Sequence, residues 1–224
     1  MKVEKIVIIG AGPYAVNIKE IISQTASPTG EKREVLGYLD EDESKHGEVL
    51  HGSKVLGGLD WLSETDDRVG VVSVINPSDR ERTLEHARSY NTTHFPNLIH
   101  PSAVISPRAE IGEGNVIAQG AIIGPEVKIG DFNKINYNVT VGHHCEIGSY
   151  NTLNGFAHLT GMSSITDRCF IGPGAVIFNQ VTVHRDVTIG ANSVINRDIT
   201  SGVTVVGVPG RILPNSLDNS ERNY

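Results

Sequence analysis

The segment TVGHHCEIGSY, residues 140–150, places two adjacent histidines, His143 and His144, directly before Cys145. Imidazole exchanges a proton near neutral pH, and it is also the commonest metal ligand among protein side chains. The pair therefore predicts a general base, a metal site, or a solvated turn in a structural scaffold. Which of these three roles applies depends on the secondary structure that positions the two histidines.

The elements around the histidines repeat every six residues. From Ile99 to Ile195 an aliphatic residue keeps the same phase without an insertion. The residue two positions earlier is usually small or valine, and the residue after the aliphatic one is often Gly or Asn, which tolerate positive φ. A period of six residues matches neither the two-residue alternation of a β-strand nor the 3.6 residues per turn of an α-helix. It predicts a short strand followed by a corner, repeated as a solenoid.

Three such strands would close one triangular coil of about 18 residues, so the span from Ile99 to about Thr200 predicts between five and six stacked coils. The aliphatic side chains are then expected to stack on one another inside. The alternative is an ordinary sandwich of short strands, for which turns would be spaced by about 8 to 12 residues.

In this solenoid the two histidines follow a corner glycine. The positions one coil away from His143 are Pro125 and Gly161, so its side chain is expected to face a residue that lacks bulk and exposes its N–H. Asn136 adds a carboxamide at the preceding corner, and His144 is a second candidate for the work of the base. A base, an amide donor and a carboxamide match acyl transfer, in which a nucleophile loses a proton and a tetrahedral oxyanion needs stabilisation.

Zinc is the competing hypothesis for the histidines. Its available ligands are His158 and His184, but His143 and His158 differ by 15 positions and His158 and His184 by 26, so these pairs do not stack one coil apart. We therefore expect no metal site, with His158 and His184 at the surface. Cys145 lies at the small inward phase, which favours core packing over a nucleophile.

Residues 1–98 follow a different pattern. KIVIIGAGPYAVNIKEIIS predicts a buried strand, a glycine turn and a helix, while EVLGYLD and VGVVSVIN predict two further strands. A charged helix is expected over residues 79–89. This order predicts a small, Rossmann-like α/β domain with a parallel sheet. Residues 41–58 are polar and predict a loop over the sheet edge.

The glycine turn of this first domain is a second candidate site. Gly10, Gly12 and Ala15 fit the pattern G-x-G-x-x-A between a strand and a helix, where free N–H groups accept a phosphate. Asp40 ends the next strand, where an acid can accept from a ribose or base donor. Two βα units are too few for a dinucleotide domain, so we expect a mononucleotide or a nucleotide sugar. The alternative is that the glycines only serve the tight turn.

Composition excludes several classes of function. Acidic residues outnumber basic residues 26 to 19, giving a net charge of -7, which disfavours nucleic acid as a partner. No segment reaches the roughly 18 apolar residues of a membrane-spanning helix, and the start does not resemble a signal peptide. Two cysteines predict no disulfide framework and a cytoplasmic protein.

The motifs together resemble a known family. The hexapeptide repeats followed by GVPGRI, residues 207–212, look like the left-handed β-helix acyltransferases, which use an acyl-CoA donor. The segments IIGAGPYA, VLGYLDED, FPNLIHPSAVIS and INYNVTVGHHCEIGSY are similar to bacterial nucleotide-sugar N-acetyltransferases of the bacillosamine and perosamine type. They are also similar to the related sialic acid O-acetyltransferases. The resemblance covers residues 3–213.

The resemblance implies a left-handed parallel β-helix over residues 99–213, after a nucleotide-sugar-binding domain over residues 1–98 and before a flexible tail over residues 214–224. It also implies a homotrimer, acetyl-CoA bound along the β-helix, and a role in making cell-surface polysaccharide. The base of the family falls on His143, and its neighbouring asparagine on Asn136.

The proposed contacts follow from the same motifs. For CoA they are Gly161, Gly207, Pro209 and Arg211, although an ordinary C-terminal turn with a solvated arginine is the alternative for the last three. For the nucleotide sugar they are Gly10, Gly12, Pro13, Tyr14 and Asp40.

Two positions depart from the family pattern. An acid usually follows the base, where this chain has His144, so we expect a weaker base, an orienting group from elsewhere, or lower activity. Glu146 lies two residues further along. At the front turn, Pro13 and Tyr14 replace the commoner Gly-His, and Tyr14 is a candidate to stack on the ligand or bond to it.

The sequence thus predicts an acetyl-CoA-dependent N-acetyltransferase for a nucleotide-linked deoxyamino sugar, with His143 as the base and Gly161 N–H as the oxyanion donor. The alternatives are an O-acetyltransferase for a sialic-acid-like sugar, a non-catalytic β-helix scaffold that binds a nucleotide sugar, and a metal-dependent hydratase of the same architecture.

Overall fold

The computed structural model describes residues 3–25, 30 and 32–214. The chain divides into two compact units, Met1–Pro101 and Ser102–Tyr224. Of the predicted flexible tail, only Pro214 lies within the described residues. No helix in the described part is long and apolar enough to cross a membrane.

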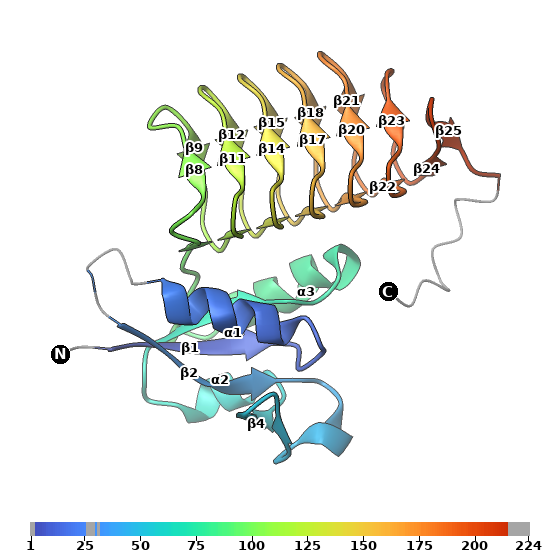
Figure 1. The fold of residues 1–224 in the computed structure, drawn as a ribbon. Helices are drawn as coiled ribbons and strands as arrows, with labels where there is room; N and C mark the ends of the chain where they lie inside the picture. Colours follow the sequence, from blue (N-terminus) through green and yellow to red (C-terminus); the bar gives the residue numbers. More distant parts are fainter. Residues whose placement is uncertain (1–2, 26–29, 31, 215–224) are drawn as a thin grey trace. The chain divides into compact units, whose positions relative to one another are not determined.

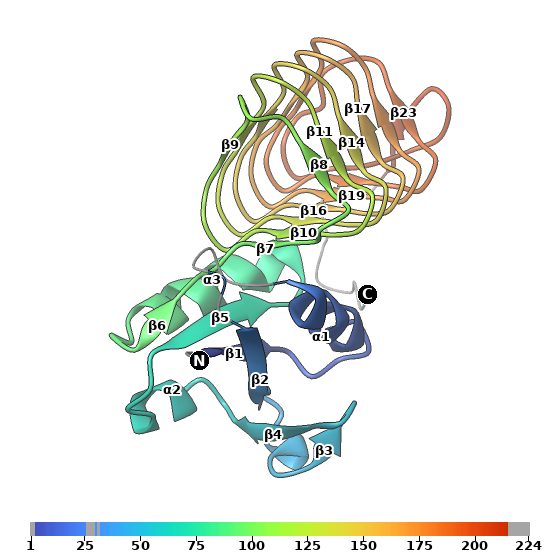
Figure 2. The same ribbon diagram turned by 60° about the vertical axis from the view of Figure 1, so that its left-hand side comes forward.

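The first unit is built on a six-stranded sheet in the order β3-β4-β2-β1-β5-β6 (Figures 1 and 2). All neighbours are parallel except the hairpin of β3 and β4. Its strands are β1 Val3–Ile9, β2 Lys32–Leu39, β3 Val49–Leu50, β4 Ser53–Gly57, β5 Val69–Ser73 and β6 Thr93–His94. Its helices are α1 Ala15–Gln24, the short 3-10 helix Glu43–Lys45, α2 Trp61–Glu64 and α3 Pro77–Arg88.

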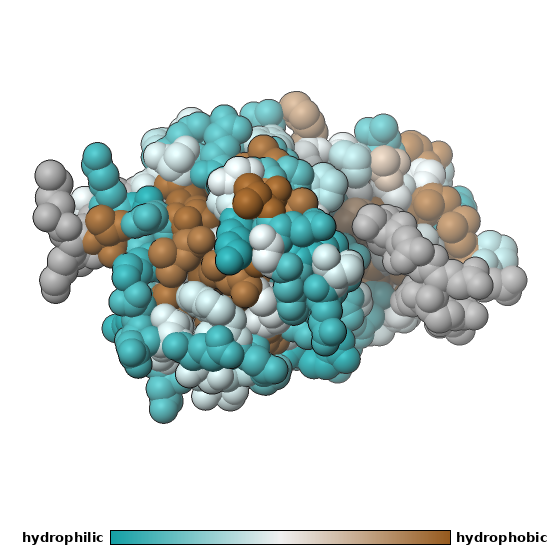
Figure 3. Space-filling view, turned by 90° about the horizontal axis from the view of Figure 1, so that it is seen from below, coloured by the Kyte–Doolittle hydropathy of each residue, from teal (hydrophilic) through white to brown (hydrophobic). Residues whose placement is uncertain are grey.

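The core of the first unit forms where apolar runs coincide with central strands. β1 lies between β2 and β5, and its residues Ile6 to Ile9 are all buried, as a parallel strand covered on both faces requires. Helix α1 buries Ala15, Ile18, Ile21 and Ile22 on one side. On the face turned to the viewer in Figure 3, polar residues surround smaller apolar areas. The predicted small α/β domain is confirmed, with a mixed rather than purely parallel sheet.

The prediction of a loop over residues 41–58 is wrong. This segment contains the 3-10 helix, β3 and β4, and β4 extends the sheet by pairing with β2, with Tyr38 opposite Val55. Gly37 on β2 allows β4 to lie this close, because a Cβ at position 37 would be only 2.7 Å from Cγ of Leu56 on β4. Only Val55 of β4 is fully buried, so this short strand, which lies between β3 and β2, carries too few buried apolar residues to stand out from a polar sequence.

The second unit is a solenoid with three flat faces, each a sheet of parallel strands except for β25, which pairs antiparallel at the end of one face (Figure 2). One face holds β8 Val104–Ile105, β11 Ile122–Ile123, β14 Thr140–Val141, β17 His158–Leu159, β20 Val176–Ile177 and β23 Val194–Ile195. A second holds β9 Glu110–Ile111, β12 Lys128–Ile129, β15 Glu146–Ile147, β18 Ser164–Ile165 and β21 Thr182–Val183. The third holds β10 Val116–Ile117, β13 Lys134–Ile135, β16 Thr152–Leu153, β19 Phe170–Ile171, β22 Thr188–Ile189, β24 Thr204–Val206 and β25 Arg211–Ile212. The strand β7 Leu98–Ile99 precedes the solenoid in the chain.

Each coil pairs in register with the next. Ile123 lies opposite Val141, and Val141 opposite Leu159, so residue i faces residue i+18 along the stack. The repeated aliphatic residue is the second residue of every two-residue strand, and from Ile117 to Ile195 it is buried. This confirms the predicted period and the inward stacking. The last turn is shorter, because Ile189 pairs with Val205, 16 positions further on.

The corners differ from the prediction in one respect. We expected positive φ directly after the aliphatic residue, but the left-handed residue lies three positions after it, as at His144, with φ 57°, and at Gly120, with φ 70°. The glycines directly after the aliphatic residue have another cause. A Cβ on Gly172 would lie 2.7 Å from the backbone of Gly190 and Ala191 in the next coil. Close packing of neighbouring coils, not φ, therefore selects glycine there.

A ladder of buried asparagines runs along one inner edge of the solenoid. The side-chain oxygen of Asn115 accepts from the backbone N–H of Asn133 at 2.8 Å, and that of Asn133 accepts from the N–H of Asn151 at 2.9 Å. The Asn133 amide also donates to the carbonyl of Gly148 at 2.8 Å. Each carboxamide thus satisfies corner groups that would otherwise be buried without partners.

Replacing Asn133 by alanine should lower the thermal midpoint of the protein by about 5 to 10 °C, because buried donors and acceptors in two coils lose their partners. Asn196→Ala is the matched control, since Asn196 is exposed at another corner. Circular dichroism during heating measures both variants. Equal midpoints for the two would show that the ladder does not stabilise the solenoid.

Candidate active site

The two histidines lie at the corner between β14 and β15. Both are exposed, whereas Cys145, which follows them, is fully buried. The corner is fixed to the coil on either side: the N–H of His144 donates to the carbonyl of Pro125 at 3.0 Å, and the carbonyl of His143 accepts from the N–H of Met162 at 2.9 Å. The backbone therefore holds both imidazoles at a rigid edge of the solenoid.

The imidazole of His143 lies directly over Gly161 in the next coil. A Cβ built on Gly161 would be 2.6 Å from both Cε1 and Nε2 of the ring. The corresponding corner position in the next coil carries Asn179, so the corner backbone accepts a side chain elsewhere in the solenoid. The histidine ring itself is what requires glycine at position 161.

A second glycine keeps an amide donor accessible beside the ring. A Cβ on Gly142 would lie 2.8 Å from the backbone nitrogen of Gly161. Among the described residues, no acceptor is found for the N–H of Gly161, whereas its carbonyl accepts from the Asn179 amide at 2.7 Å. The corner thus combines an exposed imidazole with a free amide donor, as oxyanion stabilisation requires.

The ring of His143 contacts the ring of its neighbour. Nδ1 of His143 and Nδ1 of His144 are 3.2 Å apart, within hydrogen-bonding distance. Glu146, the nearest acid along the chain, lies on β15 with its side chain exposed on the outer face. The sequence left open which group would replace the acid expected after the base, and in the structure the group in contact with Nδ1 of His143 is the His144 ring.

The other candidates of this region lie elsewhere. Asn136 is 4% exposed, and its amide donates to the carboxamide of Asn154 at 3.1 Å, so its predicted role beside His143 stays a prediction. The thiol of Cys145 points inward and donates to the carbonyl of Thr160 at 3.1 Å, which confirms the prediction of core packing. The other cysteine, Cys169, is also buried, and burial raises the pKa of its thiol to about 12.

The remaining histidines of the solenoid are at the surface, as predicted. His158 contacts the hydroxyl of Thr140 on the outer face of β17, and His184 is exposed at a later corner. Across residues 3–25, 30 and 32–214, no group of three or more His, Cys, Asp or Glu side chains is placed to hold a metal ion.

The C-terminal turn predicted to contact CoA is exposed. Gly207 has a φ of 97°, the bond between Val208 and Pro209 is cis, and Arg211 begins β25, which pairs antiparallel with β24. The guanidinium of Arg211 donates to the neighbouring carbonyl of Gly210 at 3.3 Å and is otherwise directed to the surface. The roles of Gly207, Pro209 and Arg211 stay predictions.

In the first unit, the glycine turn is tied to the end of β2. The carboxylate of Asp40 accepts from the N–H of Ala11 at 2.9 Å and from the N–H of Asp42 at 3.1 Å, and Lys45 donates to it at 3.2 Å. Burial acts to raise the pKa of Asp40, but these hydrogen bonds and the Lys45 charge outweigh it and hold the pKa below its ordinary value. The partners of Asp40 in the structure are Ala11 of the turn, Asp42 and Lys45, and its predicted contact with a ribose or base stays a prediction.

The two glycines of the turn have different surroundings. Gly10 has a φ of 97°, and a Cβ there would be 2.9 Å from the side chain of Val74, so only glycine fits. Around Gly12 nothing lies within 4 Å of the position of a Cβ, which leaves open space over the start of α1. A phosphate group approaching the first N–H groups of the helix would therefore meet no side chain.

Tyr14 and Pro13 stand beside this space. Pro13 is exposed, and Tyr14 is half-buried at the N-cap of α1. Arg80 on α3 is 1% exposed, donates to the carbonyl of Ile75 at 2.8 Å, and interacts electrostatically with Tyr14. Burial lowers the pKa of Arg80 to about 10, an effect that Tyr14 opposes. Sequence reasoning missed Arg80 because its helix is almost uniformly charged, which predicts a solvated face.

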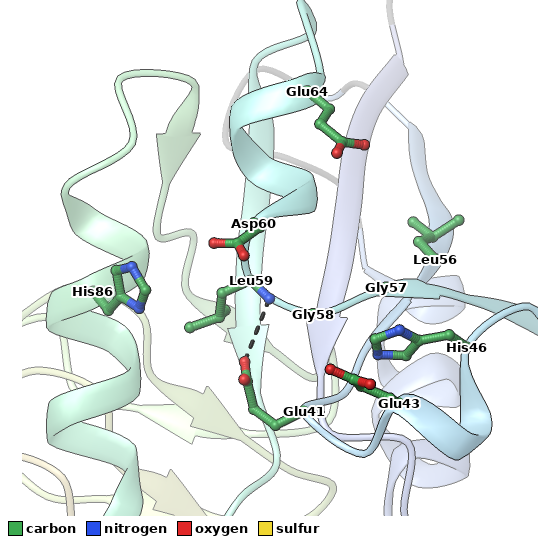
Figure 4. Close-up of a pocket in the computed structure, with 10 residues that line it drawn as sticks. All are labelled: Glu41, Glu43, His46, Leu56, Gly57, Gly58, Leu59, Asp60, Glu64 and His86. Carbon is green, nitrogen blue, oxygen red and sulfur yellow. Dashed lines mark hydrogen bonds between the residues drawn. The ribbon is translucent and has the colours of Figure 1, made fainter.

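A cavity of about 430 Å³ opens beyond the carboxyl ends of β2 and β4 (Figure 4). Its floor includes Gly57 and Gly58, and the Glu41 carboxylate accepts from the N–H of Leu59 at 3.4 Å. The polar side chains around it are acidic or histidine: Glu41, Glu43, His46, Asp60, Glu64 and His86. Sequence reasoning missed this cavity, because its lining comes from the segment that was predicted to be a loop and from α2 and α3.

Parts of the chain are similar in sequence to known protein families. Residues 5–87 match the family model of the PglD N-terminal domain. Short parts of the chain match serine acetyltransferases, for example that of Synechococcus elongatus, with 36% identity over 64 residues. That match covers 26% of this chain and 26% of the relative, so the chain spans only about a quarter of these enzymes.

Three solved structures are similar over nearly the whole chain. PerB from Caulobacter crescentus, in complex with CoA and GDP-perosamine, has 31% identity and a TM-score of 0.82, covering 94% of this chain and 97% of that one. The acetyltransferase domain of PglB from Neisseria gonorrhoeae has 29% identity and a TM-score of 0.82, covering 94% and 100%. WeeI from Acinetobacter baumannii has 28% identity and a TM-score of 0.81, covering 95% and 100%.

Fold and comparisons together define a left-handed parallel β-helix acyltransferase with an α/β domain before the β-helix. More narrowly, the chain belongs to the hexapeptide-repeat sugar N-acetyltransferases that include the perosamine N-acetyltransferase of Caulobacter crescentus. The predicted fold and the predicted family are therefore confirmed, while the roles of individual residues stay proposals.

Replacing Gly161 by alanine should lower kcat about 100-fold or more, because the added Cβ displaces the His143 ring, and displacements of about 1 Å cost this much. Gly155→Ala is the matched control: Gly155 occupies the equivalent corner one strand earlier, and a Cβ there would be 3.3 Å from its nearest neighbour. Acetyl-CoA turnover and thermal midpoints are measured for both. A Gly161 variant as active as the Gly155 variant would contradict the geometry described for the ring.

Replacing Asp40 by alanine should destabilise the first unit by about 1.5 to 3 kcal/mol at pH 7, the usual contribution of hydrogen bonds to a charged group. Because the folded pKa is lowered, this contribution is present above the unfolded value of about 3.9 and is lost as the pH falls through the folded pKa. Trp61, the single tryptophan, lies in the first unit and reports its urea unfolding by fluorescence. A stability difference between wild type and variant that does not shrink toward acid pH would contradict this account.

Proposed function

We propose that this protein transfers an acetyl group from acetyl-CoA to the amino group of a nucleotide-linked deoxyamino sugar, with His143 as the general base. The observation that carries the proposal is the corner where the His143 ring lies over Gly161 beside the free N–H of that residue. Similarity to PerB, which was solved with CoA and GDP-perosamine, supports both substrates.

The proposed reaction uses the groups at this corner. The neutral amine of the sugar attacks the thioester carbonyl of acetyl-CoA, forming a C–N bond and a tetrahedral oxyanion, and the N–H of Gly161 donates to that oxyanion. Nε2 of His143 takes one proton from the attacking nitrogen. Collapse of the intermediate breaks the C–S bond, and CoA leaves as a thiol after receiving that proton. The products are an amide and free CoA.

We place the nucleotide in the first unit. The open space at Gly12 and the positive end of the α1 dipole suit the diphosphate, and Tyr14 lies at the side of this space. The acidic cavity beside Glu41 does not suit phosphate, since carboxylates repel it, but it offers acceptors for ribose hydroxyls and for the amino and imino groups of a base. Both regions lie at the carboxyl edge of the sheet, where α/β folds bind ligands.

We propose that the enzyme works as a homotrimer in the cytoplasm, with the CoA arm along the β-helix near Gly161 and the turn of Gly207, Pro209 and Arg211. Large apolar side chains are exposed on the single chain, including Ile122 at 47%, Phe156 at 68% and Phe178 at 46%, and such patches support self-association. The two free, buried cysteines fit a reducing compartment.

The test is thiol release from acetyl-CoA with matched acceptors, a nucleotide sugar with an amino group and the same sugar with only hydroxyl groups. We expect release with the amino sugar alone. Release with the hydroxyl sugar would instead support an O-acetyltransferase, and tight binding of the amino sugar without release would support a non-catalytic scaffold.

Replacing His143 by alanine should lower kcat by roughly 10² to 10⁴ while leaving assembly and KM for acetyl-CoA close to wild type, because only proton removal is lost. His184→Ala is the matched control, since His184 is exposed at a solenoid corner away from this site. Wild-type turnover in the His143 variant would remove this residue from the mechanism.

A further inference from the structure

The contact between the two imidazoles constrains where their protons lie. Nδ1 of His143 faces Nδ1 of His144 at 3.2 Å, with the ring centroids 5.3 Å apart and the planes at 85°. Each neutral imidazole has one N–H and one lone pair. A hydrogen bond between the two Nδ1 atoms therefore requires that one ring carries its proton on Nδ1 and the other on Nε2.

Only one of the two arrangements leaves His143 able to act. If His144 donates, His143 carries its proton on Nε2, the nitrogen that lies over Gly161, and cannot accept a proton there. If His143 donates, its Nε2 is unprotonated and faces the position of the substrate, while His144 carries its proton on Nε2. The reaction therefore depends on His144 being the acceptor.

The backbone holds His144 in the orientation that this role needs. Its φ of 57° is left-handed, a conformation in which Asn, Asp and His occur more often than most residues other than glycine. The hydrogen bond from its N–H to the carbonyl of Pro125 and the bond from Met162 to the carbonyl of His143 fix the corner between two coils. The ring of His144 is thus presented to His143 by the scaffold.

We propose that His144 is a positioning residue whose neutral imidazole accepts the Nδ1 proton of His143 and so keeps Nε2 of His143 free to take the proton of the substrate amine. This inference rests on the proposed function of His143. When His143 has taken that proton it carries N–H on both nitrogens, and its Nδ1–H still donates to His144. The neutral His144 ring places no net charge beside the imidazolium of His143.

The corner offers closely matched variants. His144→Gly keeps a left-handed backbone without strain but has no acceptor, whereas His144→Asn and His144→Asp tolerate the same backbone and keep an acceptor oxygen. We expect His144→Gly to lower kcat by about 10- to 100-fold with KM for both substrates unchanged, the usual effect of losing an orienting partner. His144→Asn and His144→Asp should restore kcat to within a few-fold of wild type.

A spectroscopic measurement tests the tautomers directly. In the full-length protein labelled with ¹⁵N at histidine, two-bond ¹H–¹⁵N correlation spectra at a pH where both rings are neutral distinguish Nδ1–H from Nε2–H. The signals are assigned from the His143→Ala and His144→Asn variants. We expect His143 as the Nδ1–H tautomer and His144 as the Nε2–H tautomer in wild type, and a shift of His143 toward the Nε2–H tautomer in His144→Gly.

The outcomes separate this inference from the proposed function. Wild-type kcat in His144→Gly, or an Nε2–H tautomer of His143 in wild type, would overturn the role of His144. If His143→Ala is inactive in the same experiments, the proposed role of His143 as the base still holds. Equal loss of kcat in the Gly, Asn and Asp variants would also overturn it, since it would mean that the imidazole of His144 itself carries protons. Full activity of His143→Ala would overturn both.

Discussion

The in-register stacking of coils is the constraint on which the rest of this structure depends. Parallel strands stack at about 4.8 Å, so every side chain at a corner lies directly over the residue 18 positions away. At some corners side chains stack on one another, as Phe132 and Tyr150 do with ring centroids 5.3 Å apart, and at others a side chain lies over a glycine. Histidine over glycine at positions 143 and 161 is one such arrangement, and it gives an exposed imidazole beside an amide donor that is unpaired among the described residues.

The same constraint makes the site rigid. The backbone groups of His143 and His144 are hydrogen-bonded to the coils on either side, and the buried asparagines next to the corners satisfy the groups that strand pairing leaves over. A general base works best when its orientation is set before the substrate binds. The solenoid supplies this preorganisation through its backbone, so the site needs no large hydrophobic pocket around the imidazoles.

The first unit, where we place the nucleotide, offers different surroundings from those of the histidine corner. A nucleotide presents a dianionic diphosphate and a base and ribose rich in donors, and the two parts need opposite surroundings. The open helix end at Gly12 offers positive potential, whereas the cavity near Glu41 offers acceptors. Asp40 connects the two regions by bonding to Ala11 of the turn at the end of the strand that leads to Glu41. The Asp40 carboxylate therefore helps to fix the conformation of the glycine turn.

The sequence by itself determined the solenoid, the boundary in period near residue 98, the family and the two histidines, because a strict six-residue repeat fixes which residues share a face and which lie one coil apart. It did not reveal β4, the acidic cavity, the buried Arg80, the bond of Asn136 to Asn154, or the hydrogen bond between Asp40 and the glycine turn. These depend on contacts between segments with no common period. Only the tertiary structure decided that the His143 and His144 rings face each other through their Nδ1 atoms, since that depends on ring directions set by one left-handed residue.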